Sequence, residues 1–231
     1  MKLNGVSCIL TDIEGTTTSV SFVYDTLFPY FRDNINELKT LTYDLEVQKA
    51  FRKTVELSKE LEGTSLKSVE DIILTLDRWS REDKKITPLK TVQGLLWKKG
   101  YESGAIKGHV YDDVAPSIKA WKKIGFTLAV FSSGSVTAQR LIFRYSEAGD
   151  LTPYFSNYFD TETGSKRESQ TYKNIAQELQ FVAQEILFLS DVQEELEAAK
   201  SAGFQTIQLV RPGTISSWEN TIADFSELQF N

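Results

Sequence analysis

Short apolar runs and amphipathic segments alternate regularly between residues 113 and 210, and few folds accommodate such a pattern. The apolar runs predict strands at 126–131, 158–159, 186–189 and 206–210, and the segments beside them predict helices at 114–123, 135–145, 168–179 and 194–202. Residues 6–12 add a further buried strand. Such alternation predicts an α/β fold with a doubly wound, parallel-sheet, Rossmann-like core.

Residues 17–112 have a different character. Apolar side chains recur there at helical spacing, and no strand-like alternation interrupts them. The helices expected are 22–38 with a break at Pro29, 44–61 behind a capping Asp44, 68–79, and 87–100 opened by Thr87 and Pro88. We therefore predict a core domain of residues 1–16 and 113–231, with residues 17–112 inserted as a helical cap.

Composition and charge argue against several kinds of partner and location for the protein. The chain of 231 residues has a net charge of −6, which disfavours nucleic acid because phosphate backbones recruit clustered Lys and Arg. The single cysteine, Cys8, cannot form an internal disulfide and is read as buried filler. The N-terminal apolar run is too short for a signal peptide, and the longest uncharged stretch, 125–139, is broken by Ser, Thr and Gly. We expect a cytoplasmic protein; its oligomeric state stays open, with a monomer compatible.

The first of four polar clusters follows the first predicted strand. Asp12 and Glu14 are two residues apart on an extended chain, so their side chains point the same way, and Gly15 permits a sharp turn. Two carboxylates on one face are costly unless a cation lies between them, and magnesium is the usual hard partner. The alternative is a strand end with two solvated acids.

The second and third clusters suit an anion. Ser132 and Ser133 stand where a strand runs into a helix, a place where hydroxyls and backbone N–H groups bind anions. Lys166 lies in the loop after the short strand and could neutralise phosphate. Simple helix capping and a solvated lysine are the alternatives.

The fourth cluster follows the strand 186–189. Asp191 is expected to cap the next helix, with Glu194 or Glu195 in its first turn, where the helix dipole favours acids. Each cluster is modest by itself, but all four occupy the carboxyl ends of predicted strands, the edge where open α/β sheets bind ligands.

In this order the clusters resemble the motifs of the haloacid dehalogenase-like superfamily. Asp12 matches its nucleophile and Glu14 the acid two residues on. Ser132 matches the hydroxyl of the second motif, Lys166 the cation of the third, and Asp191 the metal ligand of the fourth. Most members carry Asp where this chain has Glu14.

That departure points to one family of the superfamily. The segments Asp-Ile-Glu-Gly-Thr-Thr (12–17), Phe-Ser-Ser-Gly-Ser (131–135) and Gln-Gly-Leu-Leu-Trp (93–97) resemble the enolase-phosphatases, or acireductone synthases, of methionine salvage, and the resemblance covers essentially the whole chain. It implies substrate contacts by Ser133 and Lys166 as well as Ser132.

The resemblance also implies a reaction. Asp12 would form an aspartyl phosphate, Glu14 would act as acid and then base, and magnesium would be held by Asp12, Asp191 and the Glu14 carbonyl. The implied substrate is 2,3-diketo-5-methylthiopentyl 1-phosphate, enolised and then dephosphorylated to acireductone. The enolisation base stays unassigned, as does any support of the metal site by Glu195.

Other readings stay open. A haloacid dehalogenase would share Asp12 but needs no metal, and a phosphomutase or another small-metabolite phosphatase would share the core with a different cap. A phosphate-binding module without catalysis is the third. His109, the single histidine, is a weaker candidate base than the carboxylates, and Trp97 is a candidate for lining the substrate pocket.

Overall fold

The computed structural model describes residues 1–230 and divides into two compact units. The core unit comprises Met1–Val20 and the chain from Lys107 onward, and the helical unit comprises Ser21–Ile106. The predicted domain boundaries, after residues 16 and 112, lie a few residues from these points.

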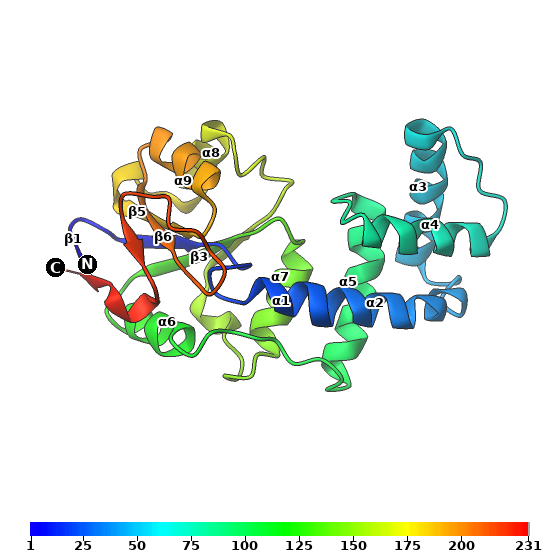
Figure 1. Ribbon diagram of the computed structural model, residues 1–231, viewed down its shortest axis with the longest axis horizontal. Coiled ribbons are helices and arrows are strands. Elements are labelled where there is room, and N and C mark those ends of the chain that lie inside the picture. Colours follow the sequence, from blue (N-terminus) through cyan, green and yellow to red (C-terminus); the bar gives the residue numbers. More distant parts are fainter. Residues whose placement is uncertain (231) are drawn as a thin grey trace. The chain divides into compact units, whose positions relative to one another are not determined.

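The core unit is built on a parallel six-stranded sheet (Figure 1). Its strands are β2 (Cys8–Thr11), β3 (Thr127–Phe131), β4 (Asn157–Phe159), β5 (Ile186–Ser190), β6 (Gln205–Leu209) and β7 (Thr221–Ile222). Their order is β4-β3-β2-β5-β6-β7, and every neighbouring pair is parallel. The predicted doubly wound parallel sheet is confirmed; β7, two residues long, has no pattern that would reveal it.

β2 is the point at which the chain changes the direction in which it adds strands to the sheet. Cys8 pairs with Thr127 of β3 on one side and with Ile186 of β5 on the other. The chain runs outward from β2 through β3 to β4 and then returns to β5. A crevice opens where a sheet divides in this way, just beyond the carboxyl end of the central strand. Asp12 follows that end directly.

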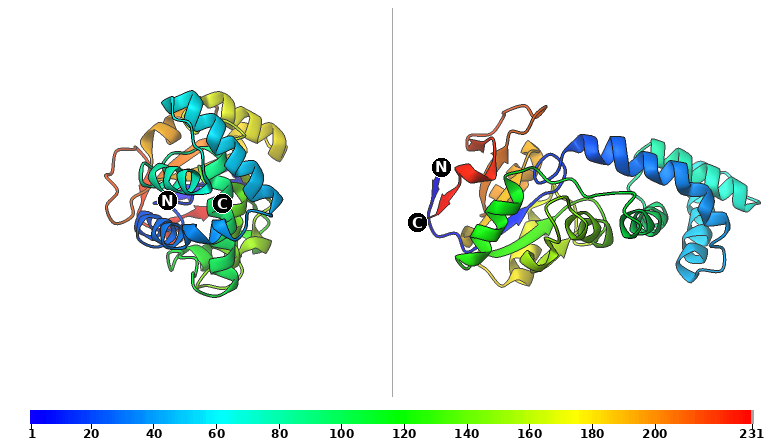
Figure 2. Two further views of the ribbon diagram at one scale, coloured as in Figure 1. Left: turned by 90° about the vertical axis from the view of Figure 1, so that its right-hand side faces the viewer. Right: turned by 90° about the horizontal axis from the view of Figure 1, so that it is seen from below.

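Helices cover both faces of this sheet (Figures 1 and 2). They are α6 (Val114–Lys123), α7 (Val136–Arg144), α8 (Ser169–Leu179) and α9 (Gln193–Ser201). Alternate residues of the strands, among them Leu10, Phe131 and Phe188, form one buried cluster with side chains of α8 and α9. The sheet is thus buried on both sides, as its nearly continuous apolar strands require.

The ends of the described chain meet in a second, small sheet. β1 (Lys2–Leu3) pairs in parallel with β8 (Gln229–Phe230), and the core unit also has short 3-10 turns at Thr152–Tyr154, Ala183–Glu185 and Phe225–Glu227.

The helical unit opens with one irregular run. α1 (Val20–Phe22) passes through a π-helical turn (Val23–Leu27) into α2 (Phe28–Asn34) and a 3-10 turn (Ile35–Lys39). Pro29 stands in the first turn of α2 and has no N–H to donate to the preceding turn, and the π-helical turn Val23–Leu27 lies directly before it. The predicted break therefore falls just before the proline, as a π-helical turn in a chain that stays helical.

Three longer helices complete the helical unit: α3 (Leu45–Glu62), α4 (Val69–Arg81) and α5 (Thr87–Glu102). Asp44 caps α3 by accepting from the N–H groups of Glu46 and Val47, as predicted. The predicted cap of α5 is wrong: Ile86 is the N-cap and Thr87 is the first helical residue.

Trp97 belongs to the interior of the helical unit. It is 7% exposed, donates from Nε1 to the carbonyl of Leu27 at 2.8 Å, and stacks on Phe28 with ring centroids 6.4 Å apart. These contacts make Trp97 a packing residue of its own unit. None of the helices within residues 1–230 is long and apolar enough to cross a membrane.

Candidate active site

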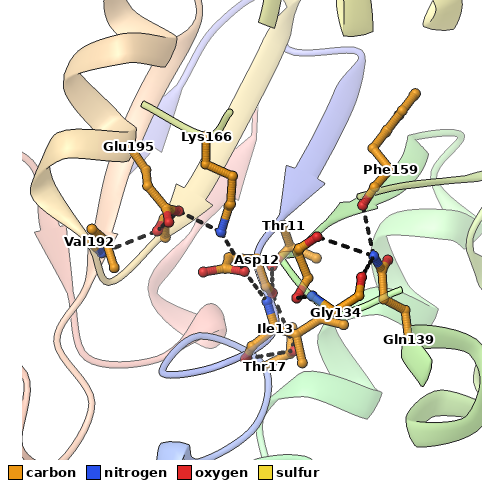
Figure 3. A network of polar contacts seen from close by, with 12 residues as sticks. Thr11, Asp12, Ile13, Thr17, Gly134, Gln139, Phe159, Lys166, Val192 and Glu195 are labelled. Carbon is orange, nitrogen blue, oxygen red and sulfur yellow. Dashed lines mark hydrogen bonds and ion pairs between the residues drawn. The ribbon is translucent and has the colours of Figure 1, made fainter. Parts of the chain in front are cut away.

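Asp12 stands where β2 ends and is 4% exposed. Its Oδ1 accepts from the N–H of Ile13 at 2.7 Å and lies 2.7 Å from Nζ of Lys166. Both of these donors reach the same oxygen (Figure 3). Within residues 1–230 we find no donor to Oδ2, so that oxygen remains for a ligand.

Lys166 bridges two acids. Its Nζ lies 2.7 Å from Asp12 and 2.6 Å from Oε2 of Glu195, and its side chain is 7% exposed (Figure 3). Ser190 donates to that Oε2 at 2.9 Å, and the carbonyl of Lys166 accepts from the hydroxyl of Tyr172 at 2.8 Å. Lys166 is therefore anchored at both its backbone and its charged end, and the solvated-loop alternative is wrong.

Asp191 follows β5, the neighbour of β2. Its Oδ1 is buried and finds no hydrogen-bond partner among the residues that the structure describes. The predicted capping role is wrong: the N-cap of α9 is Val192, whose N–H donates to Ser190 Oγ at 3.2 Å. A buried carboxylate oxygen without a donor is costly, and a bound cation is the kind of partner that would offset this cost.

Gly15 has no side chain, and the Asp191 carboxylate occupies the space where a side chain would stand. A Cβ at this position would stand 2.2 Å from Oδ2 of Asp191, and the glycine has a φ of +70°. Any larger residue would therefore displace the carboxylate and strain the turn. This close approach joins the first and fourth sequence clusters.

Glu14 occupies the turn between Asp12 and Gly15 and is half-buried. A single carbonyl holds this turn together, because the N–H groups of Thr16, Thr17 and Thr18 all donate to Ile13 O at 2.9–3.2 Å.

Charge repulsion and burial together act on the acids. Burial, with repulsion from Asp12 and Glu14 and despite the attraction of Lys166, raises the pKa of Asp191 to about 7. Burial alone would lower the pKa of Lys166, but the carboxylates of Asp12 and Glu195 outweigh it and raise that pKa above its usual value. Lys166 is therefore cationic, and the site has more negative charge than its one lysine offsets.

The donors fit a magnesium ion. Two carboxylates, those of Asp12 and Asp191, converge with an orphaned oxygen, and magnesium commonly takes one or two carboxylates together with water and substrate phosphate. In the described part of the chain, no group of three or more His, Cys, Asp or Glu side chains is arranged to hold a metal.

Ser132 and Ser133 directly follow β3, the strand on the other side of β2. Ser132 is buried, its Oγ accepts from Gly134 N at 3.3 Å, and its N–H donates to the Phe159 carbonyl. Ser133 is half-buried. Ser135 caps α7 through Ala138 N, so capping falls to a different serine from the two predicted to bind substrate.

Sequence reasoning missed the role of two side chains. Gln139 is buried and donates to the carbonyls of Gly134 and Phe159, both at 2.8 Å, which fixes the loop after β3 (Figure 3). The predicted place of Glu194 or Glu195 in the first turn of α9 is confirmed, but the contact of Glu195 with Lys166 depends on a loop distant in sequence. Spacing could have flagged Glu195, which stands four residues after Asp191.

His109 has a structural place. Its Nδ1 accepts from the N–H of Ser19 at 3.1 Å and lies 2.9 Å from Thr18 Oγ1. These hydrogen bonds connect the two segments in which the chain leaves and re-enters the core unit. They give Nδ1 of His109 a structural role, so no role as a base is needed to explain it.

Comparison with known proteins gives concordant matches. The model of the haloacid dehalogenase-like hydrolase family matches residues 6–203. "Enolase-phosphatase E1" of Picosynechococcus sp. is 50% identical over 96% of this chain and 98% of its own length. The protein of that name from Hahella chejuensis is 45% identical over 98% and 97%.

Two solved structures are similar as well. The UTR4 protein of Saccharomyces cerevisiae has a TM-score of 0.80 and 34% identity, covering 96% of this chain and all of its own. CbbY from Rhodobacter sphaeroides, solved with phosphate, has a TM-score of 0.59 at 18% identity over 97% of each chain, which is a likeness of fold alone.

Proposed function

Because the chain belongs to the haloacid dehalogenase-like hydrolases, and within them to the enolase-phosphatase E1 family, we propose that it converts 2,3-diketo-5-methylthiopentyl 1-phosphate to acireductone. The substrate is enolised first, and the enol is then dephosphorylated through an aspartyl phosphate. Its partner is a small phosphorylated metabolite, and its place is the cytoplasm.

The observation that carries the phosphatase chemistry is the buried pair of Asp12 and Lys166 beside the orphaned Asp191 oxygen. Lys166 faces the position that a phosphate would take against Asp12, and its charge would hold phosphate oxygens there. Ser132 and Ser133 border the same edge from β3 and supply further polar contacts.

In the first step, Oδ2 of Asp12 attacks phosphorus, and the bond from phosphorus to the leaving oxygen breaks. Glu14 gives its proton to that oxygen, so the enol departs neutral. In the second step, the Glu14 carboxylate takes a proton from a water molecule that attacks the aspartyl phosphate. Inorganic phosphate leaves, and Asp12 and protonated Glu14 are restored.

Asp12, Asp191 and the Glu14 carbonyl would hold magnesium. When bound, this ion supplies neutralisation of charge between phosphate and the nucleophile. Lys166 supports the first half of the reaction as well, since its ammonium group stabilises an enolate beside the phosphate. We propose that the helical unit serves as the cap that selects the substrate.

A substrate panel tests this function. The purified protein is incubated with the diketo phosphate, with 4-nitrophenyl phosphate and with a 2-haloacid, each with magnesium and with a chelator, while phosphate, halide and the enediol chromophore are followed. We expect the protein to release phosphate and enediol from the diketo phosphate when magnesium is present and not when the chelator is present. Halide release in the presence of chelator would favour a dehalogenase, and phosphate without enediol would favour another phosphatase of the family.

A further inference from the structure

Arg211 is a buried cation that the reaction above does not use. It follows β6, is 5% exposed, and forms a two-pronged ion pair with Asp113, from Nη1 at 2.9 Å and from Nη2 at 2.8 Å. Its Nε donates to the carbonyl of Thr16 at 3.0 Å, and Nη1 also donates to Ala223 O at 3.2 Å. The guanidinium therefore joins segments of the chain nearly 200 residues apart in sequence.

Contacts other than the one with Thr16 hold the guanidinium in place. Asp113 is the N-cap residue of α6 but makes no capping bond with its side chain; its carboxylate binds Arg211 and accepts from Phe225 N at 2.7 Å. The Tyr111 ring lies beneath the guanidinium carbon, 4.2 Å from its centroid. An arginine held on both sides in this way presents Nε in one direction.

Thr16 is part of the turn that carries Glu14. The N–H groups of Thr16 and Thr17 both donate to Ile13 O, and Gly15 N donates to Thr18 O, so the turn moves as one body. Thr16 is fully buried. A shift of its carbonyl must therefore shift Glu14, two residues earlier.

We propose that Arg211, held by Asp113, is a positioning residue that sets the place of Glu14 through the Thr16 carbonyl. The inference rests on the proposed role of Glu14 as the acid of the first step. Proton transfer depends steeply on the placement of the acid, because the proton must travel along a short hydrogen bond to the leaving oxygen. The Asp12 carboxylate has a support outside this turn, Nζ of Lys166 at 2.7 Å, so attack by Asp12 depends less on the Arg211 contact than proton transfer from Glu14 does.

The leaving group distinguishes positioning from general damage. A nitrophenolate departs without a proton, whereas an alkoxide needs one. A displaced Glu14 therefore slows alkyl phosphates far more than 4-nitrophenyl phosphate, while a distorted or partly unfolded site slows both alike. The ratio of kcat/KM values for the two substrates is the readout.

The variant is Arg211→Lys, which retains the charge but cannot bind both oxygens of Asp113 and the Thr16 carbonyl together. We expect kcat/KM for an alkyl phosphate to fall by about tenfold or more, and for 4-nitrophenyl phosphate by less than about threefold. The matched control is Thr206→Val, which removes the partly buried hydrogen bond from Trp218 Nε1 to Thr206 Oγ1 in β6 and should leave the ratio unchanged. An equal loss on both substrates, or an unchanged ratio in folded Arg211→Lys, overturns the proposal.

If Arg211→Lys does not fold, the double variant Asp113→Leu with Arg211→Met removes both charges together and supplies the same ratio. Glu14→Gln separates this proposal from the proposed function. If Glu14→Gln leaves the ratio unchanged, the role of Glu14 is wrong. If Glu14→Gln changes the ratio and Arg211→Lys does not, only the positioning role is wrong. When both roles hold, Arg211→Lys adds no further change of ratio to Glu14→Gln.

Discussion

The Nζ atom of Lys166 lies 2.7 Å from Oδ1 of Asp12, and the two side chains are 7% and 6% exposed. The two partners depend on this pair unequally. Without Lys166, the buried Asp12 carboxylate would face a large desolvation cost, whereas Lys166 without Asp12 would keep Glu195 as a partner.

Replacement of Asp12 by Asn tests the nucleophile. The amide has nearly the same shape but cannot attack phosphorus, and Lys166 retains Glu195 as a partner. We expect phosphate release to fall by more than about a thousandfold, with a cooperative melt retained. Release is measured under single-turnover conditions and folding by circular dichroism. A folded Asp12→Asn protein with substantial turnover would remove Asp12 from the mechanism.

Replacement of Lys166 by Met tests the buried pair itself. Asp12 and Glu195 would then face each other without a cation, and we expect the free energy of unfolding to fall by about 3–5 kcal/mol. Adding Glu195→Gln should recover part of this loss, because it removes one of the two uncompensated charges. Urea denaturation measures both.

The control for this prediction is Lys53→Met, whose partner is Glu56 on the surface of α3, with side chains 53% and 63% exposed. That pair should contribute no more than about 1 kcal/mol. Equal losses in the two lysine variants would show that burial does not govern the Lys166 pair.

Glu62 gives the helical unit a pH-dependent stability. Its carboxylate accepts from Arg78, Trp79 and Lys84, and the hydrogen bond with Arg78 leads the causes that lower the pKa of Glu62 from 4.5 to about 2. A lowered folded-state pKa means that the contribution is complete above pH 4.5 and disappears as the pH falls toward 2. With allowance for solvent screening, we expect about 1–2 kcal/mol.

The measurement compares the wild-type protein with Glu62→Gln by denaturation across this pH range. The difference between the two should be largest near neutral pH and should shrink as the pH falls below 4.5. Glu56→Gln on the same helix serves as the control, since its side chain is 63% exposed. A difference that stays constant with pH would contradict the ionic origin.

Replacement of Trp97 tests whether this side chain packs within the helical unit or contacts the substrate. Because it is buried, stacks on Phe28 and bonds to Leu27 O, we expect Trp97→Ala to cost about 3–5 kcal/mol. Trp97→Phe keeps an aromatic ring and should lose about 1 kcal/mol with the hydrogen bond. Thermal melts are compared with activity on the diketo phosphate and on 4-nitrophenyl phosphate. A stable Trp97→Ala protein with altered substrate preference would restore the substrate-contact reading.

Local pattern predicted most of the secondary structure. The helix Val114–Lys123 has the bounds that its apolar spacing predicts, and the strands before Asp12, Ser132 and Asp191 end within one residue of their predicted ends. These elements are readable because one face or both must be buried, which imposes a period on the sequence. The strands β7 and β8 are two residues long and carry no such period.

Polar side chains at strand ends meet at one edge of a parallel sheet, so the amino-acid pattern is enough to predict the fold class and a set of candidate site residues: Asp12, Glu14, Ser132, Ser133, Lys166 and Asp191. The partners of these side chains become visible only in the folded chain. Glu195 binds Lys166 instead of serving only the helix dipole, Asp191 approaches Gly15 instead of capping α9, and Arg211 reaches Thr16. Each of these contacts joins segments far apart in the chain, so its geometry depends on how the whole sheet brings loops together, which no local period records.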